Sequence, residues 1–490
     1  MITSLRNKKI AGQLSLQVLI VGSVATILIA GFVVWADTYV STVSRGTDKG
    51  QAFTIAEAGI EYYRWHLAHS PLDFKDGNVT STGPYIHAYN DKDGDRLGQF
   101  ELVITAPASG SSIVTIQSTG KVDADATISK VIKVKMGLPS FARYSVVANA
   151  DIRFGEGTQV YGQLHSNGGI RFDGLAHNVV TSAKSNYDDP DHSGSNEFGV
   201  HTHVGSGDPL PPAAVPTRTD VFMAGRSFPI PAVDFNGITQ NLADMKTAAQ
   251  SGGYYQPLSY TGSYPGPQYP SYGYEIILKT NDTFDIYKVT SIAQTSRQCS
   301  TDSTKSDSFW ATWDIAAETL VASNVAFPAN GIIFIEDNLW IRGQINTARL
   351  NIGAGRFPVS ASTYASIIVN GNLTYTNYDG RDVIGLIAQN HVTVPFTSPD
   401  TMRIDAALVA QNGRAGRYHY AVSCGTGYTR TQLTLYGMIA SNQRYGFAWT
   451  DGSGYQTRTL IYDANLLYGP PPNFPITASQ YDIISWEEVK

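Results

Sequence analysis

Residues 13–36 read QLSLQVLIVGSVATILIAGFVVWA, and no charged residue occurs in this stretch before Asp37. A short polar leader precedes it and ends with Lys8-Lys9-Ile10-Ala11-Gly12. A secretory signal has an apolar core of about 7 to 15 residues, whereas Leu14 to Trp35 is long enough to cross a bilayer as a helix. We therefore expect a single-pass membrane anchor. Because the basic cluster comes before it, the positive-inside rule predicts a cytoplasmic N-terminus and an extracytoplasmic remainder.

The helical pattern continues beyond the anchor. Apolar residues recur at spacings of three, four and seven: Tyr39, Val43, Phe53, Ala56, Ile60, Tyr63 and Leu67. One helix over 13–69 is therefore predicted, with a transmembrane half over 14–35 and an end at Ser70-Pro71. Such a helix would be about 85 Å long. Gly46 and Gly50 are its expected weak points, since each costs about 1 kcal/mol relative to alanine.

The composition indicates a β-rich extracellular protein. The chain has 490 residues, of which 16% are charged, while Gly 46 and Tyr 28 are high counts. The usual charged fraction is about 25%. A net charge of -6 gives no basic surface for a phosphate backbone, so we expect no nucleic-acid partner.

A small antiparallel sheet is predicted directly after the long helix. Three stretches alternate apolar and polar residues, as half-buried strands do: 99–105, 112–118 and 129–135. We expect them to pack on the second half of the helix and to form a head domain over 70–137.

The rest of the chain contains short apolar strands that each close with an asparagine. They are 332–338, 366–372, 384–390, 406–412 and 436–442, with an earlier copy at 162–169. Asparagine tolerates tight corners, and its amide can bond along a stack of them. This pattern favours a parallel β-solenoid; a β-sandwich with the same strands is the alternative.

Composition divides the solenoid region into three parts. The first solenoid part is 138–212, and the C-terminal part is 327–490. Between them, 213–326 contains a proline-rich stretch, a short helical pattern over 242–250 and a loop rich in Tyr, Gly and Pro. We expect this part to be an insertion or separate lobe. Residues 483–486 would form a last strand or cap the solenoid.

The order of leader, charge-free helix, amphipathic continuation and β-rich head resembles the type IV pilin-like proteins. Residues 51–62, with the sequence QAFTIAEAGIEY, are similar to the AEAG stretch of minor pilins of the pilus-assembly type. The resemblance implies that a prepilin peptidase cleaves between Gly12 and Gln13. It also implies assembly with other pilin-like subunits. Gln17 stands where major pilins carry a glutamate, which favours a low-copy or tip component; a plain anchor with a stalk is the alternative.

Within the bundle that the resemblance implies, packing would depend on polar and small residues that let helices approach closely. The candidates are Gln17, Gly22, Ser23, Ala25, Ala30 and Gly31.

One histidine-rich run is a candidate metal site. It contains Asp188, Asp189, Asp191, His192, Glu197, His201 and His203. His201-x-His203 places two imidazoles on one side of an extended segment, and nearby carboxylates could complete a metal shell. A solvated loop is the alternative, because the stretch is rich in Ser, Gly, Asn and Asp.

Two other acidic stretches are candidates for calcium binding and for catalysis. Residues 90–95 alternate carboxylates that could hold calcium, but the spacing does not fit an EF-hand, and a hairpin turn at Asp93-Gly94 explains them. Asp379, Arg381 and Asp382 could serve a polysaccharide-cleaving solenoid, although turn chemistry also accounts for them. No phosphate-binding loop, nucleophile elbow, zinc-protease or dinucleotide motif occurs. We expect no enzyme and no cofactor, with a divalent metal as the exception.

Two further features concern the exported part. Cys299 and Cys424 could form a disulfide in an oxidising compartment. Tyrosines gather in the loop around 254–274 and could contact a surface glycan or host-cell ligand. The sequence thus predicts a minor pilin-like surface subunit of a filament, present at the cell surface or in the pilus after assembly. The alternatives are a membrane-anchored adhesin or carbohydrate-binding protein and, third, an anchored polysaccharide-degrading enzyme.

Overall fold

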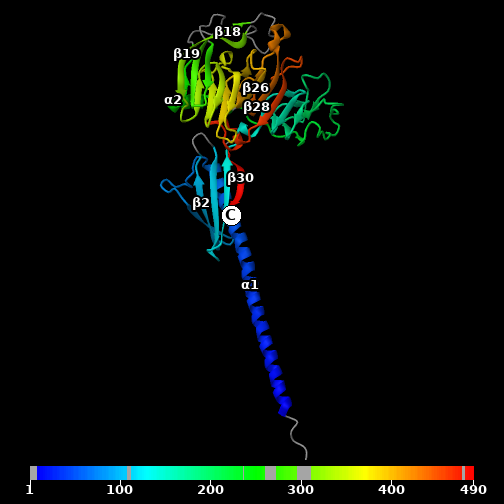
Figure 1. Ribbon diagram of the computed structural model, residues 1–490, viewed down its shortest axis with the longest axis vertical. Coiled ribbons are helices and arrows are strands. Elements are labelled where there is room, and N and C mark those ends of the chain that lie inside the picture. Colours follow the sequence, from blue (N-terminus) through cyan, green and yellow to red (C-terminus); the bar gives the residue numbers. More distant parts are fainter. Residues whose placement is uncertain are drawn as a thin grey trace, which may run out of the picture. The chain divides into compact units, whose positions relative to one another are not determined.

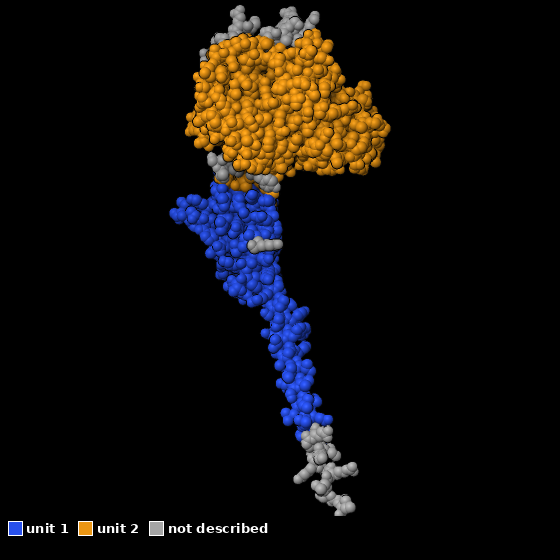
Figure 2. All heavy atoms as spheres, in the orientation of Figure 1, with its two compact units in different colours: residues 1–106, 114–136, 485–490 blue, residues 107–113, 137–484 orange. Residues whose placement is uncertain are grey.

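The computed structural model describes residues 8–107, 112–235, 237–259, 272–294, 311–476 and 480–489. The chain forms two compact units (Figure 2). Unit 1 comprises Met1–Ala106, Val114–Met136 and Ser485–Lys490, and unit 2 comprises Pro107–Ile113 and Gly137–Ile484. One long N-terminal helix, an antiparallel sheet and a large sheet with parallel strands confirm the predicted fold class.

Helix α1 runs without interruption over Lys8–His69, a length of 62 residues (Figure 1). It ends directly before Ser70-Pro71, as predicted, because proline disfavours a helical conformation in the residue before it. Gly46 and Gly50 both remain helical. Burial in unit 1 begins near Ala52, so Tyr39 and Val43 are exposed although they share the apolar pattern.

The second half of α1 packs against the sheet of unit 1. The strand order is β1–β2–β3–β4–β30. The strands are β1 Tyr85–Asn90, β2 Arg96–Thr105, β3 Val114–Val122, β4 Ser129–Gly137 and β30 Asp482–Val489. Strands β1 to β4 pair antiparallel. The three predicted strands correspond to β2, β3 and β4, whereas β1 was not predicted.

Small residues allow α1 to lie unusually close to β3. A Cβ on Gly120 would lie 2.0 Å from the backbone oxygen of Ala52, and a Cβ on Gly59 would lie 2.3 Å from Ser118 Oγ. Ala56 is fully buried beside this contact. Two residues of the AEAG stretch, Ala56 and Gly59, therefore have a packing role in unit 1.

The C-terminal strand differs from the prediction. Residues 483–486 were expected to end the solenoid, but β30 lies beside β4 in the sheet of unit 1. Lys130 on β4 pairs with Glu488 on β30, and Lys133 Nζ lies 3.7 Å from Glu487 Oε1. Unit 2 is thus inserted in the chain between two neighbouring strands of unit 1, a relationship that no local sequence pattern encodes.

Unit 2 consists mainly of short strands. They are β5 Val146–Ala148, β6 Ile152–Phe154, β7 Thr158–Tyr161, β8 Leu164–Ser166, β9 Ile170–Phe172, β10 Leu175–Ala176, β11 Val180–Ser182, β12 Asn186–Tyr187, β13 Glu197–Phe198, β14 Val200–His201, β15 Arg226–Ser227, β16 Tyr254–Gln256, β17 Gly273–Leu278, β18 Thr283–Gln294, β19 Ala311–Ala326, β20 Ile332–Ile335, β21 Leu339–Ile345, β22 Arg349–Ala354, β23 Ile367–Tyr375, β24 Val383–Ala388, β25 Val392–Val394, β26 Thr401–Ala410, β27 Ala415–Arg417, β28 Thr429–Ser441 and β29 Gly454–Tyr462. The helices are α2 Gly237–Gly252 and α3 Asn465–Tyr468, with 3-10 turns η1 Phe141–Arg143, η2 Ala361–Thr363, η3 Val422–Cys424 and η4 Thr426–Tyr428.

These strands stack in parallel rows. One row contains β16, β20, β22, β24, β26, β28, β5, β8, β11 and β15. A second contains β17, β21, β23, β26, β28, β29, β7 and β10. Strands β23, β25 and β27 form a third, and β6, β9 and β14 form a separate parallel sheet. Parallel rows on several faces make a β-solenoid and exclude the antiparallel sandwich.

The order of the rungs in space differs from their order in the chain. Strand β28 pairs with β5, and β29 pairs with β7, so the last rungs of the chain contact the first. After the first rungs, β5 to β11, the chain passes to the opposite end of the stacked rows, where β16 pairs with β20. The connecting segment between β11 and β16 includes β15 and α2. A sequence read in order gives no sign of this junction.

The predicted boundaries of the insertion also differ from the structure. Strands β16 and β17 lie within 213–326 but pair in parallel with β20 and β21, so they belong to the solenoid. Strands β18 and β19 extend β17 as an antiparallel hairpin (Figure 1). Helix α2 covers one outer face, where Leu242, Met245 and Ala249 join a core cluster. Strand β20, against which α2 packs, is consequently buried on both sides.

Candidate functional site

The apolar half of α1 is exposed. Leu19 and Ile27 are each 70% exposed. Within the described residues, α1 is the one helix long and apolar enough to cross a membrane, with a mean hydropathy of 2.5 and 0% burial over its most apolar window. Apolar surface of this extent indicates contact with lipid or with partner helices.

The predicted packing residues lie along this exposed half. Gln17, Ser23, Ala25 and Ala30 are exposed. No heavy atom lies within 4 Å of the position that a Cβ would take on Gly22 or Gly31. A neighbouring helix could therefore approach closely at these two glycines. Gly12 and Gln13 belong to α1, but their side-chain surroundings lie outside the described residues, and cleavage between them stays a prediction.

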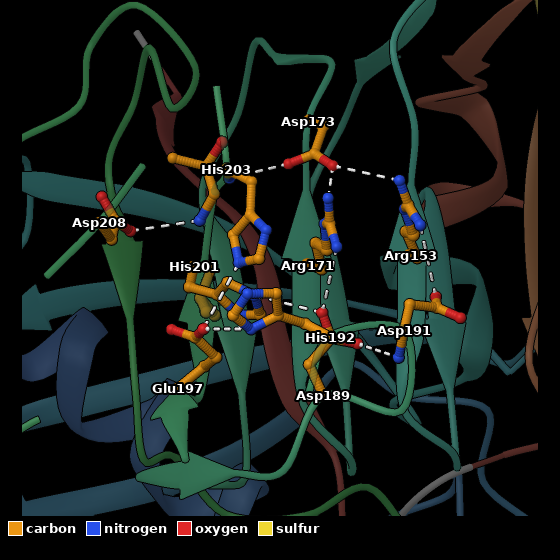
Figure 3. Close-up of polar contacts among 12 residues, drawn as sticks. Arg153, Arg171, Asp173, Asp189, Asp191, His192, Glu197, His201, His203 and Asp208 are labelled. Atoms are coloured by element: carbon orange, nitrogen blue, oxygen red, sulfur yellow. Dashed lines mark hydrogen bonds and ion pairs between the residues drawn. The ribbon is translucent and has the colours of Figure 1, made fainter. Parts of the chain in front are cut away.

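A second candidate site lies on the small sheet β6–β9–β14 of unit 2. Parallel register places Arg153 opposite Arg171, and Arg171 opposite His201. Because residues in register share a face of a sheet, the two guanidinium groups and the imidazole form a row across three strands. Figure 3 shows this row with carboxylates gathered around it.

The loop before β14 brings the predicted ligands to this row. Strands β12 and β13 form an antiparallel pair in which Tyr187 opposes Glu197. The segment between them carries Asp189 and His192 back toward His201. The backbone amide of Asp191 donates to Asp189 Oδ1 at 3.0 Å and fixes that turn. Residues separated by 14 positions in the sequence thus reach one small volume (Figure 3).

Three histidines and two carboxylates converge there. His201 Nε2 lies 3.5 Å from Asp189 Oδ2. Glu197 Oε1 lies 3.2 Å from His192 Nδ1 and 3.5 Å from His203 Nε2. The His203 ring centroid is 5.0 Å from that of His201 and 4.6 Å from that of His192. The structure thus brings together five residues that the sequence analysis had grouped, and metal binding by them stays a prediction.

Burial makes this group unusual. His201 is 0% exposed, and both of its ring nitrogens lack a hydrogen bond in the described structure, as does Asp189 Oδ2. Burial alone would raise the pKa of Asp189, but His201, the amide of Asp191 and Arg171 outweigh it and hold that pKa well below its usual range. Burial, Arg171 and His201 lower the pKa of His203, which favours its neutral form.

Arginines surround the cluster, and Arg171 pairs with one of its members: Arg171 Nη1 lies 3.5 Å from Asp189 Oδ2. Arg171 Nε donates to Asp173 Oδ2 at 2.8 Å, and Arg153 lies 3.7 Å from the same oxygen. Asp173 Oδ1 also accepts from the backbone amide of His203 at 2.9 Å. Asp191, predicted as a metal ligand, instead pairs with Arg444. Its carboxylate faces arginines rather than histidines.

A pocket of 480 Å³ opens beside the cluster. His203, Arg171 and Asp173 form part of its wall, and Arg444, Trp449 and Arg458 lie elsewhere on the lining. Arg458 is held by backbone oxygens, including that of Tyr455, and by Thr158 Oγ1. The pocket therefore combines cationic groups with an aromatic ring.

The sequence prediction missed Arg153, Arg171 and Asp173. A signal for them exists, because Ile-Arg-Phe occurs at 152–154 and again at 170–172. This short repeat would have indicated two stacked rungs with their arginines in register. Conversely, Asp188 was included in the prediction but is exposed and lies outside both histidine–carboxylate groups.

The other acidic candidates have structural roles. Asp382 is buried and accepts hydrogen bonds from the backbone amides of Ala348, Thr376 and Asn377. Asp379 is exposed and pairs with Arg381 at 2.8 Å. These contacts stabilise a corner of the solenoid.

The calcium candidate forms a turn. Asp91 Oδ1 accepts from the amides of Asp93 and Asp95 at 2.9 and 2.8 Å, between strands β1 and β2. Gly94 has a positive φ of 93°, which suits the tight connection. The hairpin interpretation of residues 90–95 accounts for this geometry.

Part of the remaining predictions lies outside the described residues. Cys424, in η3, is disulfide-bonded, but Cys299 is not among the described residues, so the Cys299–Cys424 pairing stays a prediction. The same holds for the middle of the tyrosine-rich loop, residues 260–271. At its edges, Tyr274 is buried, and the Tyr255 hydroxyl donates to Glu336.

No protein-family model matches the chain, and no curated protein matches it. Among solved structures, the chain is similar to the competence-associated pilin ComZ from Thermus thermophilus, with 11% sequence identity and a TM-score of 0.29. The alignment covers 90% of this chain and 98% of that one. A likeness at this TM-score carries no conclusion about the chain.

Proposed function

We propose that the chain is a minor pilin-like subunit that resides in the membrane through α1 and then joins a filament. The observation that supports this most directly is the division of α1 into two halves. The apolar half is exposed, with 0% burial over its most apolar window, whereas Ala52, Ala56 and Ile60 of the other half are buried against the sheet of unit 1. A folded head thereby presents a free apolar helix.

The proposed assembly step transfers the apolar half of α1 from lipid into a bundle of partner helices. Lipid is as apolar as leucine, so burial of apolar surface supplies little driving force, and close packing at small residues supplies more. Gly22 and Gly31 have open space where that packing would occur. Prepilin peptidase and other pilin-like subunits are the proposed partners.

The substitution Gly22→Leu tests the packing step. We expect it to leave membrane insertion intact and to reduce recovery of the full-length protein in sheared surface filaments at least about tenfold. The matched control is Gly46→Leu, which makes the same change in the same helix outside the apolar half. Unchanged recovery of Gly22→Leu would contradict helix packing, and equal loss in both variants would indicate helix stiffening instead.

A second candidate is an anchored adhesin that binds a surface glycan. The pocket lined by Trp449 and several arginines favours it, because an aromatic ring stacks on sugars and arginine binds their acidic groups. Binding of anionic glycans that is lost in Trp449→Ala, in a protein recovered only from membranes and never with other pilins, would support this alternative. Catalysis is not part of either proposal.

A further inference from the structure

Two groups of potential metal ligands share one histidine in the cluster on β14. Asp189, His201 and His203 form the first group, and His192, Glu197 and His203 form the second. Within each group, the ligand atoms lie within 4.8 Å of one another. His203 therefore lies between a buried pair, Asp189 and His201, and a more open pair.

The separations suit a tetrahedral ion better than direct hydrogen bonds. Zn²⁺ binds imidazole nitrogen and carboxylate oxygen at about 2.0–2.2 Å, so two ligand atoms at the corners of a tetrahedron are about 3.3 Å apart. The observed separation of His201 Nε2 and Asp189 Oδ2 is 3.5 Å, and His203 offers a third ligand atom within 4.8 Å of the other two. Nitrogen–oxygen hydrogen bonds are usually about 2.9 Å long.

His201 provides the independent observation that points to a ligand. Its side chain is fully buried, yet Nδ1 and Nε2 both lack a hydrogen bond, and Nε2 faces Asp189 Oδ2. That oxygen also lacks a hydrogen bond, and its other charged neighbour is Arg171 Nη1 at 3.5 Å. Buried polar atoms in native proteins are nearly always paired. An ion between these two atoms would satisfy one nitrogen of His201 and would give Asp189 Oδ2 a ligand bond in addition to its ion pair with Arg171.

We propose that Asp189, His201 and His203 bind one divalent transition-metal ion, for which Zn²⁺ is the best fit, and that Glu197 positions His203. Two imidazoles with carboxylates are typical zinc ligands. His192 contacts Glu197 from the more exposed side and orients it. Asp173 holds the neighbouring Arg171 through its Nε, so that this cation is partly neutralised beside the ion.

The ion would be structural. It would connect β14 to the loop between β12 and β13 through Asp189, while Glu197 on β13 contacts the ligand His203. These elements contain only two residues per strand, too few for strong ladder pairing by themselves. The alternative is a protonated His201 that pairs with Asp189 and needs no metal.

The test uses the full-length protein in detergent. Zn²⁺ is added to the chelated protein, and unbound ion is removed by exhaustive dialysis. Elemental analysis should then find about one Zn²⁺ per chain. Addition of the ion to the chelated protein should raise the Tm of unit 2 by at least about 5 °C, because an ion that binds only the folded state stabilises it. Absence of bound Zn²⁺, or no rise in Tm, would overturn the proposal.

The variant His201→Phe separates the two interpretations. We expect it to weaken Zn²⁺ binding at least about 100-fold and to abolish the rise in Tm. Without metal it should be as stable as the parent, because phenylalanine removes two unpaired buried nitrogens. The matched control, His177→Phe, changes a histidine that stacks on Tyr161 with ring centroids 3.9 Å apart and should keep Zn²⁺ binding. Equal Zn²⁺ binding in His201→Phe would overturn the proposal.

Two other variants test the proposal if His201→Phe does not fold. Asp189→Asn and Glu197→Gln keep the size of each side chain and remove its charge. Both should fold and lose at least about tenfold in Zn²⁺ affinity. If both bind Zn²⁺ as tightly as the parent, the ion is bound elsewhere and the proposed centre is wrong.

Discussion

Asn149 donates a hydrogen bond from Nδ2 to Oδ1 of Asn442 at 2.9 Å, although 293 positions separate the two residues in the chain. Asn167 Nδ2 donates in turn to Asn149 Oδ1 at 2.7 Å. Asn442, Asn149 and Asn167 follow the stacked strands β28, β5 and β8 at the same corner of the solenoid. The asparagine ladder therefore crosses the junction between the last and the first rungs of unit 2.

Replacement of Asn149 by alanine should weaken this junction. Two amide hydrogen bonds would be lost, and because the ladder faces solvent, water would replace part of them; we expect a loss of about 1 kcal/mol in the free energy of unfolding of unit 2. Denaturant unfolding measures it. Asn178→Ala, at an exposed asparagine outside the ladder, should change the free energy by less than about 0.5 kcal/mol. An equal loss of stability in Asn149→Ala and Asn178→Ala would contradict a stabilising role of the ladder.

The Asn ladder shows how far the sequence could predict the fold. Four of the five repeated stretches, those ending at Asn338, Asn390, Asn412 and Asn442, do place the asparagine just after a stacked strand. The fifth prediction was wrong, because Asn372 lies within β23. The closing asparagines could not indicate that the rung ending at Asn442 contacts the rung ending at Asn149, because that pairing depends on tertiary stacking alone. The placement of β30 beside β4 was missed for the same reason.

The sequence indicated most of the residues of the candidate metal site but not how their side chains are arranged. His201 and His203 were grouped by their spacing, and the structure places them together with Asp189 and Glu197. The sequence could not show that Asp191 is not a ligand. Its carboxylate pairs with Arg444, which lies in the loop after β28. Arginines from distant rungs pair with some of the carboxylates, and only the other carboxylates can contact the histidines.

The substitution Gly59→Ala should destabilise unit 1. Its Cβ would lie 2.3 Å from Ser118 Oγ and 3.0 Å from Phe100, so side chains must move, at a cost of about 1–3 kcal/mol. Thermal unfolding of unit 1 in detergent measures the effect. Gly46→Ala is the matched control in the same helix: it has open space and should stabilise by up to about 1 kcal/mol. A neutral Gly59→Ala would contradict the close contact of α1 with β3.

Stability of unit 2 should depend on pH through Glu318. Burial, a hydrogen bond with Glu275 and the charge of Glu275 raise the pKa of Glu318 to about 7. Since this pKa is higher in the folded protein than in the unfolded chain, the stabilising contribution is full below about pH 4.5 and is lost as pH rises through about 7. The side chain is partly solvated, so we expect a loss of only about 1 kcal/mol.

The variant Glu318→Gln checks this pH dependence. It keeps a group that can donate to Glu275 and removes the titration, so the decline in Tm between pH 5 and pH 8 should be smaller than in the parent. Asp379→Asn, at an exposed carboxylate paired with Arg381, serves as the control and should keep the parent's profile. A Glu318→Gln profile that parallels the parent would contradict the raised pKa.

The central claim is that this chain is processed and assembled as a pilin-like subunit. The most direct measurement is the mass of the N-terminal peptide of the mature protein from membrane and sheared surface fractions. The account predicts a peptide that begins at Gln13 in the surface fraction. A surface protein that retains the residues before Gln13 would contradict the account, and α1 would then be a permanent anchor for a surface-bound adhesin.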